Sequence, residues 1–119
     1  MQIDFETAGR HLVANVSGAY SLFGMRELFD RIAEESRRQG LDHVLVDVSA
    51  MSGDAPVLDR REYAEYAART LGGLLRKCAA CAGQNQRLEP FTETVAQNRG
   101  LALRVFRHRS DAVNWLTAA

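Results

Sequence analysis

The sequence predicts an α/β fold, with an N-terminal hairpin followed by alternating helices and strands. In this fold a five-stranded mixed sheet carries four helices, most of them on one face. Two alternating segments separated by a tight turn at Ala8-Gly9 indicate the hairpin, and later segments switch to helical spacing. The strands alternate apolar with polar or small residues, whereas strands covered on both faces are apolar throughout. We therefore expect one face to stay partly open, with Val13, Leu45 and Phe106 forming an apolar patch there.

The strands are expected where apolar side chains recur at every second residue. Ile3 and Phe5 share one side of the first strand, and Val44, Val46 and Val48 share one side of the third. Parallel strands need crossover connections, which are almost always right-handed, so the predicted order is β-β-α-β-α-β-α-β-α. The expected strands span residues 2–6, 11–18, 43–48, 74–83 and 101–106.

The helices are expected to begin at capping residues. Ser21 has the side chain of an N-cap, and Asp59 with Glu62 forms a capping box. Pro90 suits the first position of the third helix, and Ser110 is the expected cap of the last one. The expected helix ends are glycines, at Gly40, Gly72 with Gly73, and Gly100.

Composition limits the class of protein. The 119 residues are 46% hydrophobic and 25% charged, which predicts a single domain over residues 1–119 with its own core. Fifteen basic and fifteen acidic residues cancel, so nucleic acid is not an expected partner. No apolar run approaches the ~20 residues of a membrane span, and no secretory signal is visible. Together with only two cysteines, these features predict a cytoplasmic location.

The order of elements and three segments carry a family resemblance. The strand "VLVDVS" running into a loop, the segment "FTETVAQNRGLALRVF" and the terminal "DAVNWL" together resemble the SpoIIAA-like fold of STAS domains, which occur in sulfate transporters and anti-sigma-factor antagonists. The likeness covers essentially the whole chain and is nearer to small, uncharacterised single-domain bacterial members. It implies a regulatory or interaction domain. The same architecture is also similar to lipid-carrying SEC-fourteen-like domains.

The resemblance directs attention to the loop after the third strand. In anti-sigma antagonists an Asp-apolar-Ser strand leads to an Asp-Ser-Ser-Gly turn, where a serine at a helix N-terminus is phosphorylated. This chain keeps the first part, from Asp47 to Ser49, and lacks the second. Counted forward from Asp47, the acceptor position falls near Pro56 or Val57. When the two sequences are aligned on the expected helix cap, the acceptor position falls near Asp59, whose carboxylate would carry a permanent negative charge.

Two serines in this loop remain alternative acceptors, Ser49 and Ser52. The favoured interpretation is a polar turn in which short side chains and Gly53 satisfy the backbone.

The pair Cys78 and Cys81 has the spacing of a redox motif. It falls in an expected strand, where an offset of three residues places the two thiols on opposite faces. We therefore expect core thiols. The chain has no second cysteine pair, and its histidines are not at ligand spacing, so neither metal nor cofactor is expected. With no catalytic constellation visible, the chain is predicted not to be an enzyme.

Polar residues of the third helix form a further candidate site. They are expected at a polar end beside the carboxyl ends of the strands, where open α/β sheets bind ligands. The alternative, that Asn98 and Arg99 only terminate the helix, is favoured. Of Tyr63 and Tyr66, one is expected at the core edge and the other at an interface. The candidate residues of this helix are Thr92, Glu93, Gln97, Asn98 and Arg99.

Three functional hypotheses follow. The first is a non-enzymatic interaction or regulatory module that works as a homodimer or with a protein partner. The alternative is a domain that binds a small apolar or lipid-like ligand in a pocket lined by the tyrosines and Phe23. An enzyme with a dispersed site has the least support.

Overall fold

The computed structural model describes residues 1–84, 86 and 90–118. Within them one sheet has five strands in the order β1-β2-β3-β4-β5. β1 is antiparallel to β2, with Phe5 opposite Ala14, and the remaining neighbours are parallel. The strands are β1 (Gln2–Ala8), β2 (His11–Ala19), β3 (His43–Ser52), β4 (Lys77–Cys81) and β5 (Leu103–Phe106). The helices are α1 (Leu22–Gln39), α2 (Val57–Leu71), α3 (Pro90–Asn98) and α4 (Arg109–Thr117).

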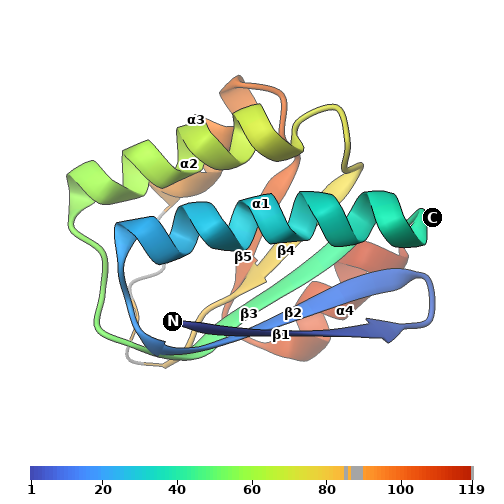
Figure 1. Cartoon of the computed structure of the whole chain (residues 1–119), viewed down its shortest axis with the longest axis horizontal. Coiled ribbons are helices and arrows are strands. Elements are labelled where there is room, and N and C mark those ends of the chain that lie inside the picture. Colours follow the sequence, from blue (N-terminus) through green and yellow to red (C-terminus); the bar gives the residue numbers. More distant parts are fainter. Residues whose placement is uncertain (85, 87–89, 119) are drawn as a thin grey trace.

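The helices are distributed unequally over the two faces of the sheet. α1, α2 and α3 cover one face, which we call the inner face, and α4 crosses the other, the outer face (Figure 1). Period-two alternation separates the two sets of side chains along each strand, so Leu12, Ala14 and Val16 point to the inner core. The α/β class, the mixed sheet and the helices gathered mostly on one face are confirmed.

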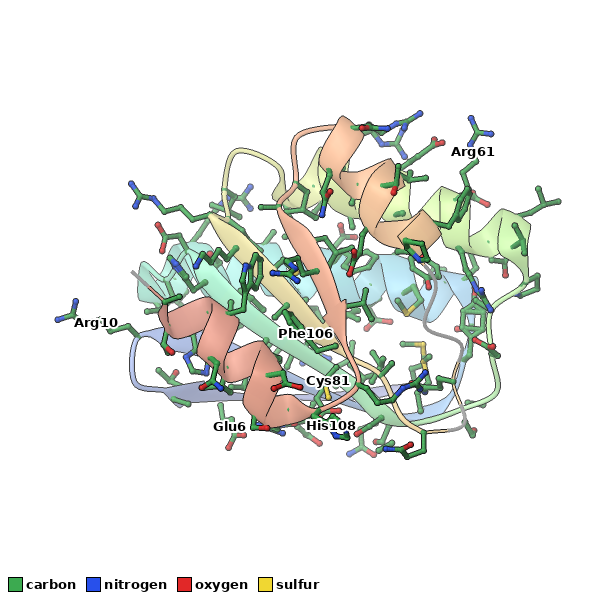
Figure 2. All side chains as sticks on the ribbon, turned by 180° about the vertical axis from the view of Figure 1, so that it is seen from behind. Glu6, Arg10, Arg61, Cys81, Phe106 and His108 are labelled. Atoms are coloured by element: carbon green, nitrogen blue, oxygen red, sulfur yellow. The ribbon has the colours of Figure 1, made fainter. Side chains whose placement is uncertain are left out.

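The expected open patch on the outer face is wrong. Val13 and Leu45 are 0% exposed because α4 lies across them and packs Ala112 and Leu116 against them (Figure 2). Phe106 is half-buried beside Trp115, with ring centroids 5.9 Å apart. Three helices thus cover the inner face, and one short helix, α4, covers the middle strands on the outer face.

The ends of α1 follow the capping predictions. Ser21 Oγ accepts a hydrogen bond of 2.9 Å from the backbone N–H of Gly24. Gly40 ends the helix with φ of 67°, a left-handed conformation that glycine adopts without strain.

The predicted caps of α2 and α4 are wrong. α2 begins at Val57 with Pro56 as its N-cap, so Asp59 lies within the first turn and its carboxylate binds Tyr20. α4 begins at Arg109, because the carbonyl of His108 accepts the N–H of Asp111 at 3.1 Å and closes the turn one residue before Ser110. Neither N-cap side chain makes a capping hydrogen bond. The starts of both helices are therefore set by tertiary contacts of the first turn.

Within the described residues, no helix is both long and apolar enough to cross a lipid bilayer.

Candidate functional site

A cavity of about 110 Å³ lies between the inner face of the sheet and the covering helices. Its floor is formed by β3, β4 and β5, and its walls are one face of α2 from Arg60 to Ala67, the first turn of α3 and one side of α1. Residues that follow β3 and β4, among them Asp54 and Ala82, line it at the carboxyl ends of these strands. It therefore occupies the carboxyl-end position at which open α/β sheets tend to bind ligands. The floor residues are Val46, Val48, Cys78, Ala80, Leu103 and Val105, and the apolar wall residues include Met25, Phe29, Ala64 and Ala67.

The cavity exists because small side chains face one another across it. Ala64 and Ala67 on α2 lie opposite Ala80 on β4, where larger residues would fill the space. Protein interiors are normally close-packed, and empty volume costs about 24 cal/mol per Å³. An enclosed void of about 110 Å³ would cost roughly 2–3 kcal/mol, which is an upper bound for this cavity because it opens at a polar rim. A loss of stability of this size suggests that the space has a function, such as binding a ligand.

Polar groups form one rim of the cavity and are bonded to the protein. Arg60, whose side chain is only 7% exposed, places Nη2 3.1 Å from Oδ2 of Asp54. Gln86 Nε2 donates to the carbonyl oxygens of Val48 at 2.7 Å and Met51 at 3.1 Å. Gln86 thereby ties the segment after β4 to the end of β3.

Two tyrosines line the same cavity as neutral phenols. Burial raises the pKa of Tyr20, and the hydrogen bond that its hydroxyl donates to Asp59 Oδ2 at 2.8 Å raises it further. Burial also raises the pKa of Tyr63, whose ring lies 6.3 Å from that of Phe29. Phe23, in contrast, is exposed and does not line the cavity.

Exposed apolar side chains gather at the beginnings of the inner helices. Phe23 is the second residue of α1, Val57 and Leu58 are the first two of α2, and Phe91 is the second of α3. Their exposed fractions are 76%, 53%, 81% and 36%, respectively. The cavity is lined by residues from all three helix beginnings, and α1 and α2 start at the same end of the molecule (Figure 1). We call these four residues the helix-start surface.

Asp47 and Ser49 lie away from the cavity, on the outer face. Asp47 Oδ1 accepts hydrogen bonds from the N–H and Oγ of Ser49, at 2.9 and 2.6 Å, and Oδ2 accepts one of 3.0 Å from Arg109. Arg109 also donates to Asn15 and Glu6, at 3.2 and 3.3 Å. Figure 2 shows Glu6 near the beginning of α4. This polar cluster fastens the first turn of α4 to the sheet.

The expected polar end of α3 is wrong in its position. α3 runs against the direction of the strands, so Asn98 and Arg99 lie at the amino end of β5, and Arg99 pairs with Glu65 at 3.3 Å. Glu93 Oε1 accepts the backbone N–H of Val105 at 2.6 Å and holds α3 on β5. Thr92, in the first turn, does line the cavity.

Of the remaining candidates, Tyr63 lines the cavity and Asp59 reaches its rim through Tyr20. Ser52 is exposed at the end of β3, and its carbonyl oxygen accepts the N–H of Tyr20 at 2.9 Å. Tyr66 lies on α2 outside the cavity and donates to Asp30 at 2.7 Å.

Sequence reasoning missed Arg60 and Gln86. A signal for Arg60 was present, because it stands four residues before Ala64 and continues the buried stripe of α2 by one turn. Gln86 had none, since its role depends on carbonyl groups about 35 residues earlier in the chain.

The two cysteines lie on opposite faces of β4, as predicted. Cys78 belongs to the inner core and Cys81 to the outer one, and both are free and buried. Burial raises the pKa of the Cys78 thiol to about 12 and also raises that of Cys81. Among the described residues no group of three or more histidine, cysteine or acidic side chains has the arrangement of a metal site.

Two solved structures match this arrangement over nearly its whole length. The anti-sigma factor antagonist SpoIIAA, in its unphosphorylated form, is 11% identical with a TM-score of 0.60, and the match covers 99% of this chain and 100% of that one. The chain has the SpoIIAA-like fold. An uncharacterised DUF3478-family protein with a SpoIIAA-like fold, from Shewanella loihica PV-4, is 17% identical with a TM-score of 0.56, covering 97% of this chain and 92% of that one.

The SpoIIAA-like fold predicted from the sequence is thus confirmed. No family model and no curated protein matches the sequence.

Proposed function

We propose that this chain is a non-enzymatic regulatory module that recognises protein through the helix-start surface. The observation that carries the proposal is the exposure of large apolar side chains on the first turns of three neighbouring helices. Exposed apolar side chains that form one patch commonly mark a contact site, and we propose that these four residues form such a patch. The fold supports a regulatory role, because SpoIIAA has it and is an anti-sigma factor antagonist. We place the module, as a single domain, in the bacterial cytoplasm.

We further propose that the helix-start surface binds a second copy of the chain. The chain carries no net charge, so two copies do not repel each other at long range. A twofold contact would bring the same apolar patch together from both copies and remove Leu58 and Phe23 from water.

The module differs from a phosphorylation switch at the start of α2. Residues 53–63 contain neither serine nor threonine, and the carboxylate of Asp59 is already bound by Tyr20. We propose that contact at this surface is constitutive. Both serines of the loop are exposed, but the hydroxyl of Ser49 donates to Asp47, so Ser52 is the better acceptor for a phosphate.

The proposal is tested by size-exclusion chromatography with light scattering at several protein concentrations. We expect the native chain to form a dimer, and Leu58→Glu to weaken it at least tenfold by placing a charge in the apolar contact. Ala102→Glu, an exposed alanine in the loop between α3 and β5, is the matched control and should leave the dimer intact. A native chain that stays monomeric at about 100 μM, far above typical specific affinities, would contradict self-association.

A second function, binding of a small apolar ligand, is supported by the cavity. Its apolar walls and its place at the carboxyl ends of the strands match the usual features of ligand sites.

A further inference from the structure

We infer that the cavity binds a neutral ligand built around a single aromatic ring. This inference rests on the second candidate function and specifies the chemical class of its ligand. Size, charge and the chemistry of the walls each contribute to it.

The size of the cavity fixes the scale of the ligand. An engineered protein cavity of about 150 Å³ lined by leucine, isoleucine and phenylalanine stays dry and binds benzene. The cavity here measures about 110 Å³ and has polar residues at one rim. One ring fits this volume, with small substituents directed toward the rim, whereas a long acyl chain does not.

The polar groups at the rim argue against a charged ligand. Asp54 is paired with Arg60, and Asp59 accepts the hydroxyl of Tyr20. Among the described residues every buried side-chain nitrogen or oxygen already has a hydrogen-bond partner. A carboxylate entering the cavity would lose its hydration and would have to compete with Asp54 for the guanidinium of Arg60, which that carboxylate already holds.

The walls favour an aromatic ring over an aliphatic group of similar size. Phe29 and Tyr63 present rings about the same space, and Met25 adds a thioether. Tilted ring pairs and sulfur–aromatic contacts each stabilise by more than burial of their area alone. Cys78 contributes a neutral thiol to the floor.

The test compares toluene with benzoate, which share a ring and differ in charge. Two-dimensional NMR of the full chain is recorded while each probe is added. We expect toluene to shift the signals of Ala64, Ala80 and Val105 in a saturable way, and benzoate to bind at least tenfold more weakly.

Variants that fill the cavity test whether it is the site at which toluene binds. Ala80→Leu occupies the space with side-chain atoms and should reduce toluene affinity at least tenfold, and Ala64→Val serves the same purpose should the first variant fail to fold. Ala50→Leu places the same change on an exposed alanine of β3 and should bind toluene as the native chain does.

The outcomes separate the claims. Benzoate binding as tightly as toluene would overturn the neutral class and leave ligand binding standing. Equal toluene binding by native chain and both filled variants would overturn the cavity as the site. No binding of either probe by the native chain would overturn both ligand proposals, while the interaction function would still be decided by the light-scattering experiment.

Discussion

At the scale of single residues, Arg60 illustrates how a charged side chain becomes part of an interior wall. It extends the buried stripe of α2 and meets Asp54, whose side chain remains 43% exposed at the rim. Its aliphatic stem supplies apolar contact while its guanidinium is paired. The stem and the charge therefore make separate contributions, which substitutions can distinguish.

We expect Arg60→Ala to lower the free energy of unfolding by about 2–3 kcal/mol, because it removes the buried stem and enlarges the cavity. Arg60→Met keeps the stem and should cost less than about 1 kcal/mol, because the carboxylate of Asp54 is 43% exposed and water replaces its lost partner. Urea denaturation monitored by circular dichroism measures both. Equal losses in the two variants would show that charge, not packing, is the main contribution.

The buried thiol of Cys78 predicts a loss of stability at alkaline pH. Its folded pKa is about 12 and the ordinary value is 9.0, so between these values the folded state holds a proton that the unfolded state has released. Unfolding is then favoured as pH rises, by about 1.4 kcal/mol per pH unit for each such thiol. The stabilisation is fully present below pH 9.

Urea denaturation at about pH 8, 8.6 and 9.2 tests this expectation while the tyrosines, whose ordinary pKa is 10.0, stay mostly protonated in the folded and unfolded states. Cys78→Ala should be less stable at every pH and should show a shallower decline, with Cys81 and the buried tyrosines accounting for the remainder. An unchanged slope in this variant would contradict the assignment to Cys78.

Some single-residue features could be predicted from local sequence and others could not. Ser21 and Gly40 act through neighbours within one helical turn, so their roles were visible in the sequence. Asp59 also has the composition of a cap, but Tyr20 binds it across 39 residues of chain and the helix begins before it. Local rules fail where a distant partner uses the same atom.

At the scale of elements, α4 has an unoptimised beginning. Its N-cap, His108, makes no side-chain capping bond, although its backbone angles are extended as an N-cap requires. Aspartate at this position would accept a free N–H of the first turn and interact favourably with the helix dipole.

We expect His108→Asp to raise the free energy of unfolding by about 0.5–1.5 kcal/mol. His108→Ala is the control that removes the imidazole without adding an acceptor, and it should give no gain. Thermal denaturation of the three proteins compares them, and equal midpoints for the aspartate and alanine variants would refute the capping argument.

The other end of α4 is held by Lys77. Its Nζ donates to the carbonyl oxygens of Trp115 at 2.7 Å and Ala118 at 3.3 Å, and it lies 5.1 Å from the centroid of the Trp115 ring. A cation at a helix C-terminus satisfies carbonyl groups that have no partner within the helix.

Lys77→Met should therefore loosen α4 and lower the free energy of unfolding by about 1–2 kcal/mol. Trp115 is the chain's single tryptophan, so acrylamide quenching of its fluorescence reports the docking of this helix directly. Arg76→Met, at the exposed neighbouring position, is the control and should quench as the native chain does. Unchanged quenching in Lys77→Met would contradict the clamp.

At the scale of the whole molecule, the strand and helix order followed from periodicity, whereas the coverage of the outer face did not. Polar residues such as Asn15 and Asp47 suggested an exposed face, yet they surround a short apolar area that one nine-residue helix can cover. Alternation along a strand does not show how far its apolar side extends across the neighbouring strands.

The cavity was not predictable from the sequence for a related reason. Ala64, Ala67 and Ala80 read as ordinary small core residues, and only their meeting across two elements leaves space between them. A cavity forms where side chains from several elements leave space between them, so the sequence of one element cannot predict it.

The open edges of the sheet have a consequence for assembly. β5 has only four residues, and β1, with seven, is the longer lateral edge. A second copy adding antiparallel about Phe5 would set Asp4 of each chain opposite Glu6 of the other, and directly opposed like charges destabilise cross-strand pairs. The alternating carboxylates of β1 thus disfavour the edge-to-edge pairing through which exposed sheet edges aggregate.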